Sequence, residues 1–234
     1  MDSTQELTRT IAELQRDLAA KNRELEIEAA LERVRSRSMG MHKSEELVEV
    51  IASVFHELEQ LKFRVDSASL FLNYKENPFK FWMAVPGYLY PAEMDVPYGD
   101  FALMNLFMRE IKSDAKLVTA KFNQEEKNEW ARHLIQHTIV GNASDEKKKQ
   151  MFEAPGLAVS VAGVKNIALA ITNYSVQSYS DEENEILRRF VIVFDQTYTR
   201  FLDLQKAEAQ AREAQVEAAL ERVRSRTTGM QKSE

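Results

Sequence analysis

Two histidines in the second half of the chain have a spacing that suits metal chelation. His133 and His137 lie four residues apart, so on a helix their rings would project from the same face. No glutamate follows His133 in the pattern of zinc proteases, and no third ligand is evident nearby in the sequence. A pair at this spacing more often packs against neighbours or faces solvent. We therefore favour packing and expect no metal site.

A third histidine, His56, begins a segment that can be compared with a phosphoacceptor box. His56-Glu57-Leu58 matches the first three residues of many histidine-kinase acceptor helices. Residues 59–61, Glu-Gln-Leu, then stand where a basic residue, a small polar residue and a proline are expected. No glycine-rich nucleotide-binding segment follows within the chain. We interpret His56 as an ordinary residue of a domain helix.

Arginines alternate at Arg33, Arg35 and Arg37, a density that suggests a nucleic-acid patch. On a helix, residues two apart point in directions that differ by about 200°, so the three do not share a surface. Glu28 and Glu32 offer ion pairs along the same helix instead. The net charge of −6 gives no general reason to expect nucleic acid either. We expect solvated, partly ion-paired arginines and no nucleic-acid partner.

The remaining composition narrows the chemistry further. The chain has no cysteine, which excludes a disulfide scaffold, a thiolate metal site and a cysteine nucleophile. No nucleophile–base arrangement and no phosphate-binding loop is found, so we expect no catalytic residue, no cofactor and no enzymatic activity. The sequence has neither a secretion signal nor a long uninterrupted apolar run. We therefore expect no membrane segment and a cytoplasmic location.

A repeated segment organises the chain. Residues 28–37, Glu-Ala-Ala-Leu-Glu-Arg-Val-Arg-Ser-Arg, recur unchanged as residues 217–226, an offset of 189 positions. The same offset relates Lys43-Ser44-Glu45 to Lys232-Ser233-Glu234. The first copy leads straight into a helix, whereas the second copy reaches the last residue. We expect the chain to be a fragment in which another domain follows.

Both copies lie in segments with the composition of long helices. Residues 4–39 contain neither glycine nor proline and are rich in Glu, Ala, Leu, Arg and Lys. A helix over residues 1–40 would be a rod roughly 60 Å long, so we expect it to pair with the same helix of a second chain. The second rod continues a helix that we predict from about Asp181 to Arg226. The predicted dimer contacts are Leu7, Ile11, Leu14, Leu18, Leu31, Val34, Phe194, Phe201, Leu220 and Val223.

Between the rods, residues 43–202 have the composition of a globular domain. Glycine and proline appear, aromatic residues concentrate, and strand-like alternation begins. The pattern predicts a helix, a hairpin over residues 63–85, a helical middle, a hairpin over residues 157–174 and a long helix, with a loop at residues 87–101. This order predicts an α+β fold, an antiparallel sheet with helices on one face. Capping boxes, which mark helix starts, are expected for Asn123 with Glu126 and Ser180 with Glu183.

The closing part of this domain resembles a known family. Residues 168–173, Ala-Leu-Ala-Ile-Thr-Asn, with Ser-Asp-Glu-Glu at 180–183, are similar to the last strand and last helix of GAF domains, which are sensory modules. The repeated linker resembles linkers of bacterial multidomain sensor proteins, including histidine kinases. The resemblance implies a GAF-like sheet in residues 43–202, flanked by coiled-coil helices over residues 1–42 and 203–234.

In GAF domains generally, a ligand lies between the sheet and the helical middle segment. By that resemblance, the candidate ligand-binding residues are Phe71, Phe81, Met83, Phe101, Met104, Met108, Trp130, His133 and Ser160. The alternative is that these mostly apolar side chains simply fill the core. The Asn-Lys-Phe-Asp-Glu set of cyclic-nucleotide-binding GAF domains is absent, and the missing cysteines argue against a covalently attached bilin.

These observations together predict a sensory and signal-transmission module of a bacterial two-component or other multidomain signalling protein. We expect a parallel homodimer that binds a small molecule and changes the register or rotation of its helices. Two alternatives stay open. The chain is a structural dimerisation spacer without a ligand, or it is a fragment of a sensor histidine kinase whose catalytic part is missing.

Overall fold

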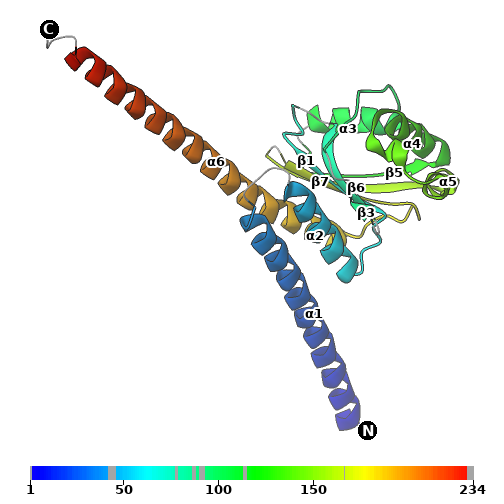
Figure 1. Cartoon of the computed structure of the whole chain (residues 1–234). Coiled ribbons are helices and arrows are strands. Elements are labelled where there is room, and N and C mark those ends of the chain that lie inside the picture. Colours follow the sequence, from blue (N-terminus) through cyan, green and yellow to red (C-terminus); the bar gives the residue numbers. More distant parts are fainter. Residues whose placement is uncertain are drawn as a thin grey trace.

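An antiparallel sheet lies at the centre of the molecule, and two long helices extend from it (Figure 1). The computed structural model describes residues 2–41, 46–76, 79–85, 88–89, 93–112, 115–165 and 167–230.

The sheet consists of two hairpins joined through their inner strands. The strand order is β3-β2-β1-β7-β6-β5, and β4 pairs with β2. Both predicted hairpins are confirmed, as β1 pairs with β2 and β6 with β7. The stretch expected to be a loop contains two short strands instead, because β3 and β4 extend the sheet at β2. The strands are β1 (Ser67–Leu72), β2 (Lys80–Val85), β3 (Tyr88–Leu89), β4 (Met94–Asp95), β5 (Leu117–Asn123), β6 (Gly156–Val164) and β7 (Ile167–Asn173).

Helices begin at the expected capping residues. The Asn123 side chain accepts hydrogen bonds from the amides of Glu125 and Glu126, and the Glu126 carboxylate accepts one from the Asn123 amide, which confirms that capping box. Ser180 and Glu183 do the same at the last helix. The helices are α1 (Asp2–Met39), α2 (Leu47–Gln60), α3 (Ala102–Lys112), α4 (Gln124–His137), α5 (Asp145–Glu153) and α6 (Asp181–Met230), so the predicted continuous last helix is confirmed.

Helices cover both faces of the sheet, which corrects the expectation of a one-sided layer. The helices α1, α2 and α6 pack on one face, and α3 and α4 on the other, with α5 beside α4 (Figure 1). Successive residues of a strand point to opposite faces. In β1, Leu70 belongs to the apolar core under α1, α2 and α6, and Phe71 belongs to the core under α3 and α4. A strand that is apolar on both sides needs cover on both sides.

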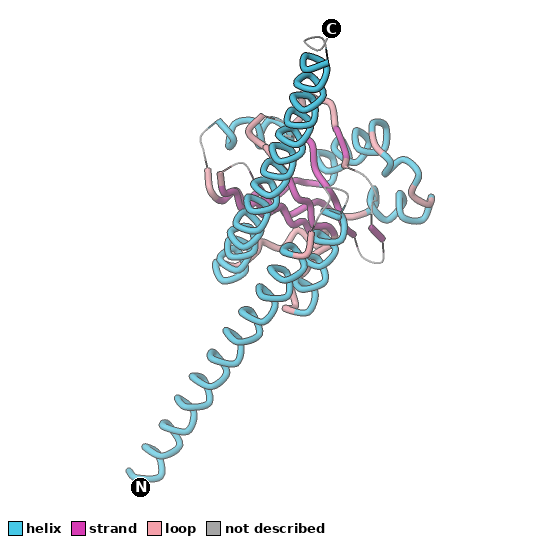
Figure 2. The backbone as a smooth tube through the Cα atoms, turned by 60° about the vertical axis from the view of Figure 1, so that its left-hand side comes forward, coloured by secondary structure: helices cyan, strands magenta, loops and turns pink. Residues whose placement is uncertain are grey.

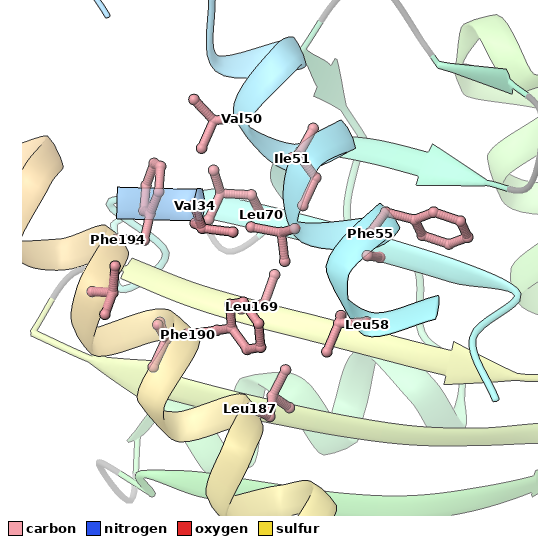
Figure 3. Packing of buried hydrophobic residues seen from close by; sticks show 14 of the residues in the cluster. Val34, Val50, Ile51, Phe55, Leu58, Leu70, Leu169, Leu187, Phe190 and Phe194 are labelled. Atoms are coloured by element: carbon pink, nitrogen blue, oxygen red, sulfur yellow. The ribbon is translucent and has the colours of Figure 1, made fainter. Parts of the chain in front are cut away.

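The last third of α1 belongs to the domain core. Leu31 and Val34 are buried in one cluster with Leu58 of α2 and with Phe194 and Phe201 of α6; Figure 3 shows Val34, Leu58 and Phe194 converging over the sheet. Four residues predicted as dimer contacts are therefore covered by their own chain, because α2 and α6 leave an apolar surface that α1 fills. This packing adds part of the first rod to the domain.

Charged side chains also fasten α1 to the domain. Arg23 donates to the carbonyl oxygen of Leu61 at 2.8 Å, just after α2. Arg189 of α6 contacts Glu24 at 2.8 Å and Glu28 at 2.6 Å. These contacts surround the apolar contact, so α1 is held by a rim of ion pairs and hydrogen bonds.

The three alternating arginines of α1 reach three different partners, as their helical spacing predicts. Arg33 pairs with Glu57 of α2, Arg35 with Glu32 of α1, and Arg37 with Glu49 of α2. The arginines are partly ion-paired, as expected, but only the pair with Glu32 lies within α1, and Glu28 pairs with Arg189 of α6 instead.

Beyond the domain, α1 and α6 extend in opposite directions (Figure 1), and Figure 2 shows α1 running clear of the sheet. Leu7, Ile11, Leu14 and Leu18 are exposed on the first extension, and Leu220 on the second. The side chain of Val223 lies outside the described residues. Within the described part of the chain, every helix is too short or too polar to cross a membrane.

Candidate ligand-binding site

A cavity of about 90 Å³ lies between the sheet and the helices α3 and α4, on the face opposite α1. Strands β1, β2, β6 and β7 form its floor. Leu103 and Phe107 of α3, Trp130 of α4 and Met151 of α5 form its cover.

Strand alternation places hydroxyl groups at one end of the floor. Ser67 and Ser69 of β1 and Thr172 of β7 line the cavity. The hydroxyls of Ser67 and Thr172 are 2.7 Å apart and share a hydrogen bond across paired strands. This end of the cavity can therefore accept or donate hydrogen bonds.

Aromatic rings form the other end. The ring centroids of Phe71 and Phe81 are 5.0 Å apart. Phe107 lies 6.2 Å from Phe71, and Trp130 lies 6.4 Å from Phe81. These spacings are typical of packed aromatic pairs, so this end presents a firm apolar wall.

A buried lysine provides the only charged group among the described lining residues. Lys127 of α4 is 1% exposed. Its ammonium group donates to the carbonyl oxygens of Met151 and, at 3.2 Å, of Phe152, and lies 5.8 Å from the centre of the Tyr174 ring. No carboxylate among the described residues forms an ion pair with it. Burial lowers the pKa of Lys127 below its usual value, because removal from water disfavours the charged form.

Sequence reasoning missed Lys127, although a signal for it exists. Lys127, Trp130, Ala131 and Leu134 follow the i, i+3, i+4, i+7 spacing of a buried helix face. A lysine in the first position of such a stripe is unusual, because lysine is almost never fully buried without a partner. Reading the whole stripe, and not its apolar members alone, would have identified this residue.

The candidate ligand-binding residues separate into lining and non-lining groups. Phe71, Phe81, Met83 and Trp130 line the cavity. Met104 is fully buried beside it, and its sulfur accepts a hydrogen bond from the amide of Gly99 at 3.0 Å. Phe101 and Met108 pack at the edge of the same core without lining the cavity.

Ser160 lies on the opposite face of the sheet, which corrects its assignment as a polar anchor for the ligand. Its hydroxyl donates to the Asn184 side-chain oxygen of α6 at 2.6 Å, and both residues are buried. Val159 and Val161, its neighbours in β6, face the cavity side instead. A shift of one residue in a strand reverses the face, and the sequence does not fix that parity in a strand that is buried along most of its length.

His133, a candidate ligand-binding residue, and its neighbour His137 do not line the cavity. His133 interacts through Nε2 with the carbonyl oxygen of Pro97 at 2.7 Å, and its ring centre is 4.5 Å from that of His137. His133 also contacts the Phe101 ring edge-on at 5.2 Å. Among the described residues, no group of three His, Asp or Glu side chains gathers around a point where a metal ion fits. The pair packs against the loop that precedes α3.

His56 is exposed on α2, and the adjacent Glu57 is buried. The Glu57 carboxylate accepts two hydrogen bonds from Arg33, at 2.7 and 2.6 Å. The residue next to the histidine thus has a packing role that ties α2 to α1.

No family model matches the chain, and no curated protein matches it. Three solved structures are similar at low identity. A structure described as a GAF domain has 12% identity and a TM-score of 0.42, covering 75% of this chain and 88% of that chain. Residues 122 to 287 of a methyl-accepting chemotaxis protein have 10% identity and a TM-score of 0.39, covering 74% and 98%. The GAF domain of an Acinetobacter phosphoenolpyruvate-protein phosphotransferase has 12% identity and a TM-score of 0.35, covering 73% and 93%.

Proposed function

We propose that this chain is a cytoplasmic sensory and signal-transmission module of a bacterial multidomain signalling protein. The cavity binds a small molecule, the chain forms a parallel homodimer through the exposed part of α1, and the chain itself carries no catalytic step. The sequence resemblance to GAF domains and to sensor-protein linkers supports the signalling assignment.

One arrangement carries the proposal: the cavity and the long helices lie on opposite faces of the same strands. In β1, Phe71 lines the cavity while Leu70 packs beneath the helices (Figure 3). In β7, Ala170 and Leu169 divide in the same way. Close-packed interiors transmit small displacements. A ligand that shifts β1 or β7 therefore alters the packing of α1 and α6.

Lys127 favours a carboxylate ligand. An ammonium group has three N–H donors, and two backbone carbonyls accept from this one. A ligand carboxylate would supply the missing negative charge, and such a bond is strong because little water is present. A cavity of about 150 Å³ holds benzene, so this one, of about 90 Å³, suits roughly four non-hydrogen atoms. The proposed ligand is a small monocarboxylate with a short apolar body.

Isothermal titration calorimetry with acetate and propionate tests this assignment. The neutral controls are the matching amides, which have nearly the same shape. We expect the carboxylates to bind at least about tenfold more tightly, since only they pair with the ammonium group. Lys127→Met, which keeps the chain length, should abolish the preference. Equal binding of acids and amides, or binding of neither, contradicts the proposed ligand class.

The dimer rests on the exposed seam of α1. Leu14 lies at the centre of the seam Leu7, Ile11, Leu14 and Leu18. Leu14→Asp should produce monomers in sedimentation velocity at micromolar concentration. The control Gln15→Asp places the same charge on the neighbouring exposed position off the seam and should leave the dimer intact. A wild-type chain that sediments as a monomer at that concentration contradicts the dimer.

A ligand-free structural spacer is the second candidate. The contacts of Lys127 with Met151 and Phe152 favour it, because they give the lysine a structural task at the end of α5. This candidate predicts that Lys127→Met lowers the stability of the domain and that no small carboxylate raises it. Membership of a sensor histidine kinase is supported by the linker resemblance alone, and the downstream gene sequence tests it.

A further inference from the structure

The two copies of the repeat have opposite surroundings. Ile27 and Leu31 of the first copy are each 3% exposed. Their equivalents in the second copy, Val216 and Leu220, are 55% and 53% exposed. The apolar stripe is thus buried against the domain in the first copy and exposed in the second copy.

The similarity of the two copies includes the charged residues that fasten the first copy. Residues 23–37 and 212–226 differ at only three positions, where Leu25, Glu26 and Ile27 correspond to Ala214, Gln215 and Val216. The five charged residues that hold α1 against α2, α6 and the loop after α2 all recur. Arg23, Glu24, Glu28, Arg33 and Arg37 correspond to Arg212, Glu213, Glu217, Arg222 and Arg226.

The recurrence of these charged residues is informative, because on a solvated helix they have no domain surface to contact. In the first copy, Arg33 pairs with a carboxylate that is 4% exposed, and Glu24 and Glu28 share Arg189. In the second copy, the Arg222 guanidinium donates to the carbonyl oxygen of Ala218 in its own helix at 3.1 Å. Residues 211–220 are all exposed.

We infer that residues 212–226 are a second docking strap, which binds the helix pair of a further domain built like this one. Its partner surface has the chemistry of α2 and α6: an apolar groove for Val216 and Leu220, a buried carboxylate for Arg222, and an arginine for Glu213 and Glu217. The first copy shows this mode of binding directly, since α1 occupies such a surface (Figure 3).

The stripe of the second copy is therefore assigned to a domain surface and not to a dimer contact. Leu220 was predicted as a dimer contact, by the same reasoning that assigned Leu31. Because Leu31 packs on its own domain, the equivalent stripe in α6 is better matched to a domain surface than to an identical helix. An identical helix would offer no buried carboxylate to Arg222.

The test extends the full chain by a copy of residues 46–204 directly after Glu234, so that Glu234 takes the place of Glu45. Because the chain has no cysteine, single thiols report burial cleanly. We expect Leu220→Cys to react rapidly with a thiol reagent in the original chain. In the extended chain the reaction should slow by roughly tenfold or more, because labelling then requires undocking.

Three further variants make the outcome interpretable. Leu31→Cys in the original chain sets the rate of a docked strap, and Leu204→Cys, at an exposed position outside the repeat, sets the rate of a bare helix. Arg222→Ala in the extended chain should restore fast labelling of Leu220→Cys. Fast labelling in an extended chain whose added domain unfolds cooperatively in calorimetry overturns the inference. Concentration-dependent protection in the original chain also overturns it, since a second copy would then cover the stripe.

A graft keeps the inference testable if the added domain does not fold. Leu25→Ala, Glu26→Gln and Ile27→Val together give the first copy the sequence of the second. Of these three residues only Ile27 is buried, so the melting temperature of the triple variant should fall by less than about 5 °C. A loss as large as that of Leu31→Ala would show that the second sequence does not suit such a surface, and would overturn the inference.

Discussion

Removal of the Arg33 guanidinium should destabilise the attachment of α1 to the domain. Glu57 is 4% exposed, and its carboxylate accepts both of its side-chain hydrogen bonds from Arg33. Breaking a fully buried pair by deleting one partner costs about 3–5 kcal/mol. The Arg33 side chain is 56% exposed, so water can reach the carboxylate after the deletion and reduce this cost. We expect Arg33→Ala to lower the free energy of unfolding by about 2 kcal/mol.

A double-mutant cycle separates the pair from general effects. Glu57→Gln removes the charge that Arg33 satisfies, so Arg33→Ala in that background should cost about 1 kcal/mol less. Arg35→Ala is the matched control, because Arg35 pairs with Glu32 of its own helix at the surface. That variant should change the free energy by less than about 0.5 kcal/mol.

The assay is urea unfolding followed by tryptophan fluorescence. Trp82 lies in the core beneath α1, α2 and α6, and Trp130 lies at the cavity on the other face. Trp130→Phe therefore leaves a reporter for the α1 side alone. A cost of Arg33→Ala no greater than that of Arg35→Ala would refute the reasoning, since the pair would then act as an ordinary surface ion pair.

Three other perturbations test separate parts of the structure. Burial raises the pKa of the Tyr179 hydroxyl, which donates to the Arg64 carbonyl oxygen at 3.0 Å. Because the folded state favours the neutral hydroxyl, the contribution of Tyr179 to stability is complete below about pH 10 and is lost as the pH rises further. Tyr179→Phe should therefore flatten the alkaline part of a plot of unfolding free energy against pH. Ser160→Ala leaves the buried Asn184 without its donor and should lower the free energy of unfolding in urea by about 1–2 kcal/mol. Gly156→Ala would place a Cβ atom 2.4 Å from the Phe122 carbonyl oxygen. The resulting strain of about 1–3 kcal/mol should lower the melting temperature by several degrees. Gly40→Ala serves as the control, because its Cβ atom would meet nothing closer than 3.6 Å.

Local patterns predicted the elements of the fold well. The capping residues Asn123 and Ser180 fixed two helix starts, because a side chain that accepts from the first free amides acts within a few residues. The long helix α6 followed from its composition.

Long-range packing was less accessible from the sequence. The stripe at Leu31 and Val34 suits a coiled-coil seam and a domain surface equally, because both need apolar residues at spacings of three and four. The apolar surface between α2 and α6 exists only after folding. For the same reason, the face of Ser160 was assigned wrongly: β6 is buried along most of its length, so no polar alternation shows which side each residue takes.

The two faces of the sheet suggest where a signal passes from the cavity to the helices. The strand β1 pairs with β7 over the whole length of β1, and each strand contributes alternate residues to the cavity side and to the helix side. The carboxylate ligand that we propose at Lys127 would change the charge balance on the cavity side alone. On the helix side of the sheet, the last third of α1 is the element that can respond. Its contact with α2 and α6 combines a short apolar stripe with ion pairs that water can reach. Such a contact costs little to open compared with a strand pair. We therefore expect the proposed signal to change the docking of α1 on α2 and α6 and not the register of the helices. Binding of the proposed ligand should then change the thiol reactivity of Leu31→Cys before it changes that of any residue in the exposed part of α1.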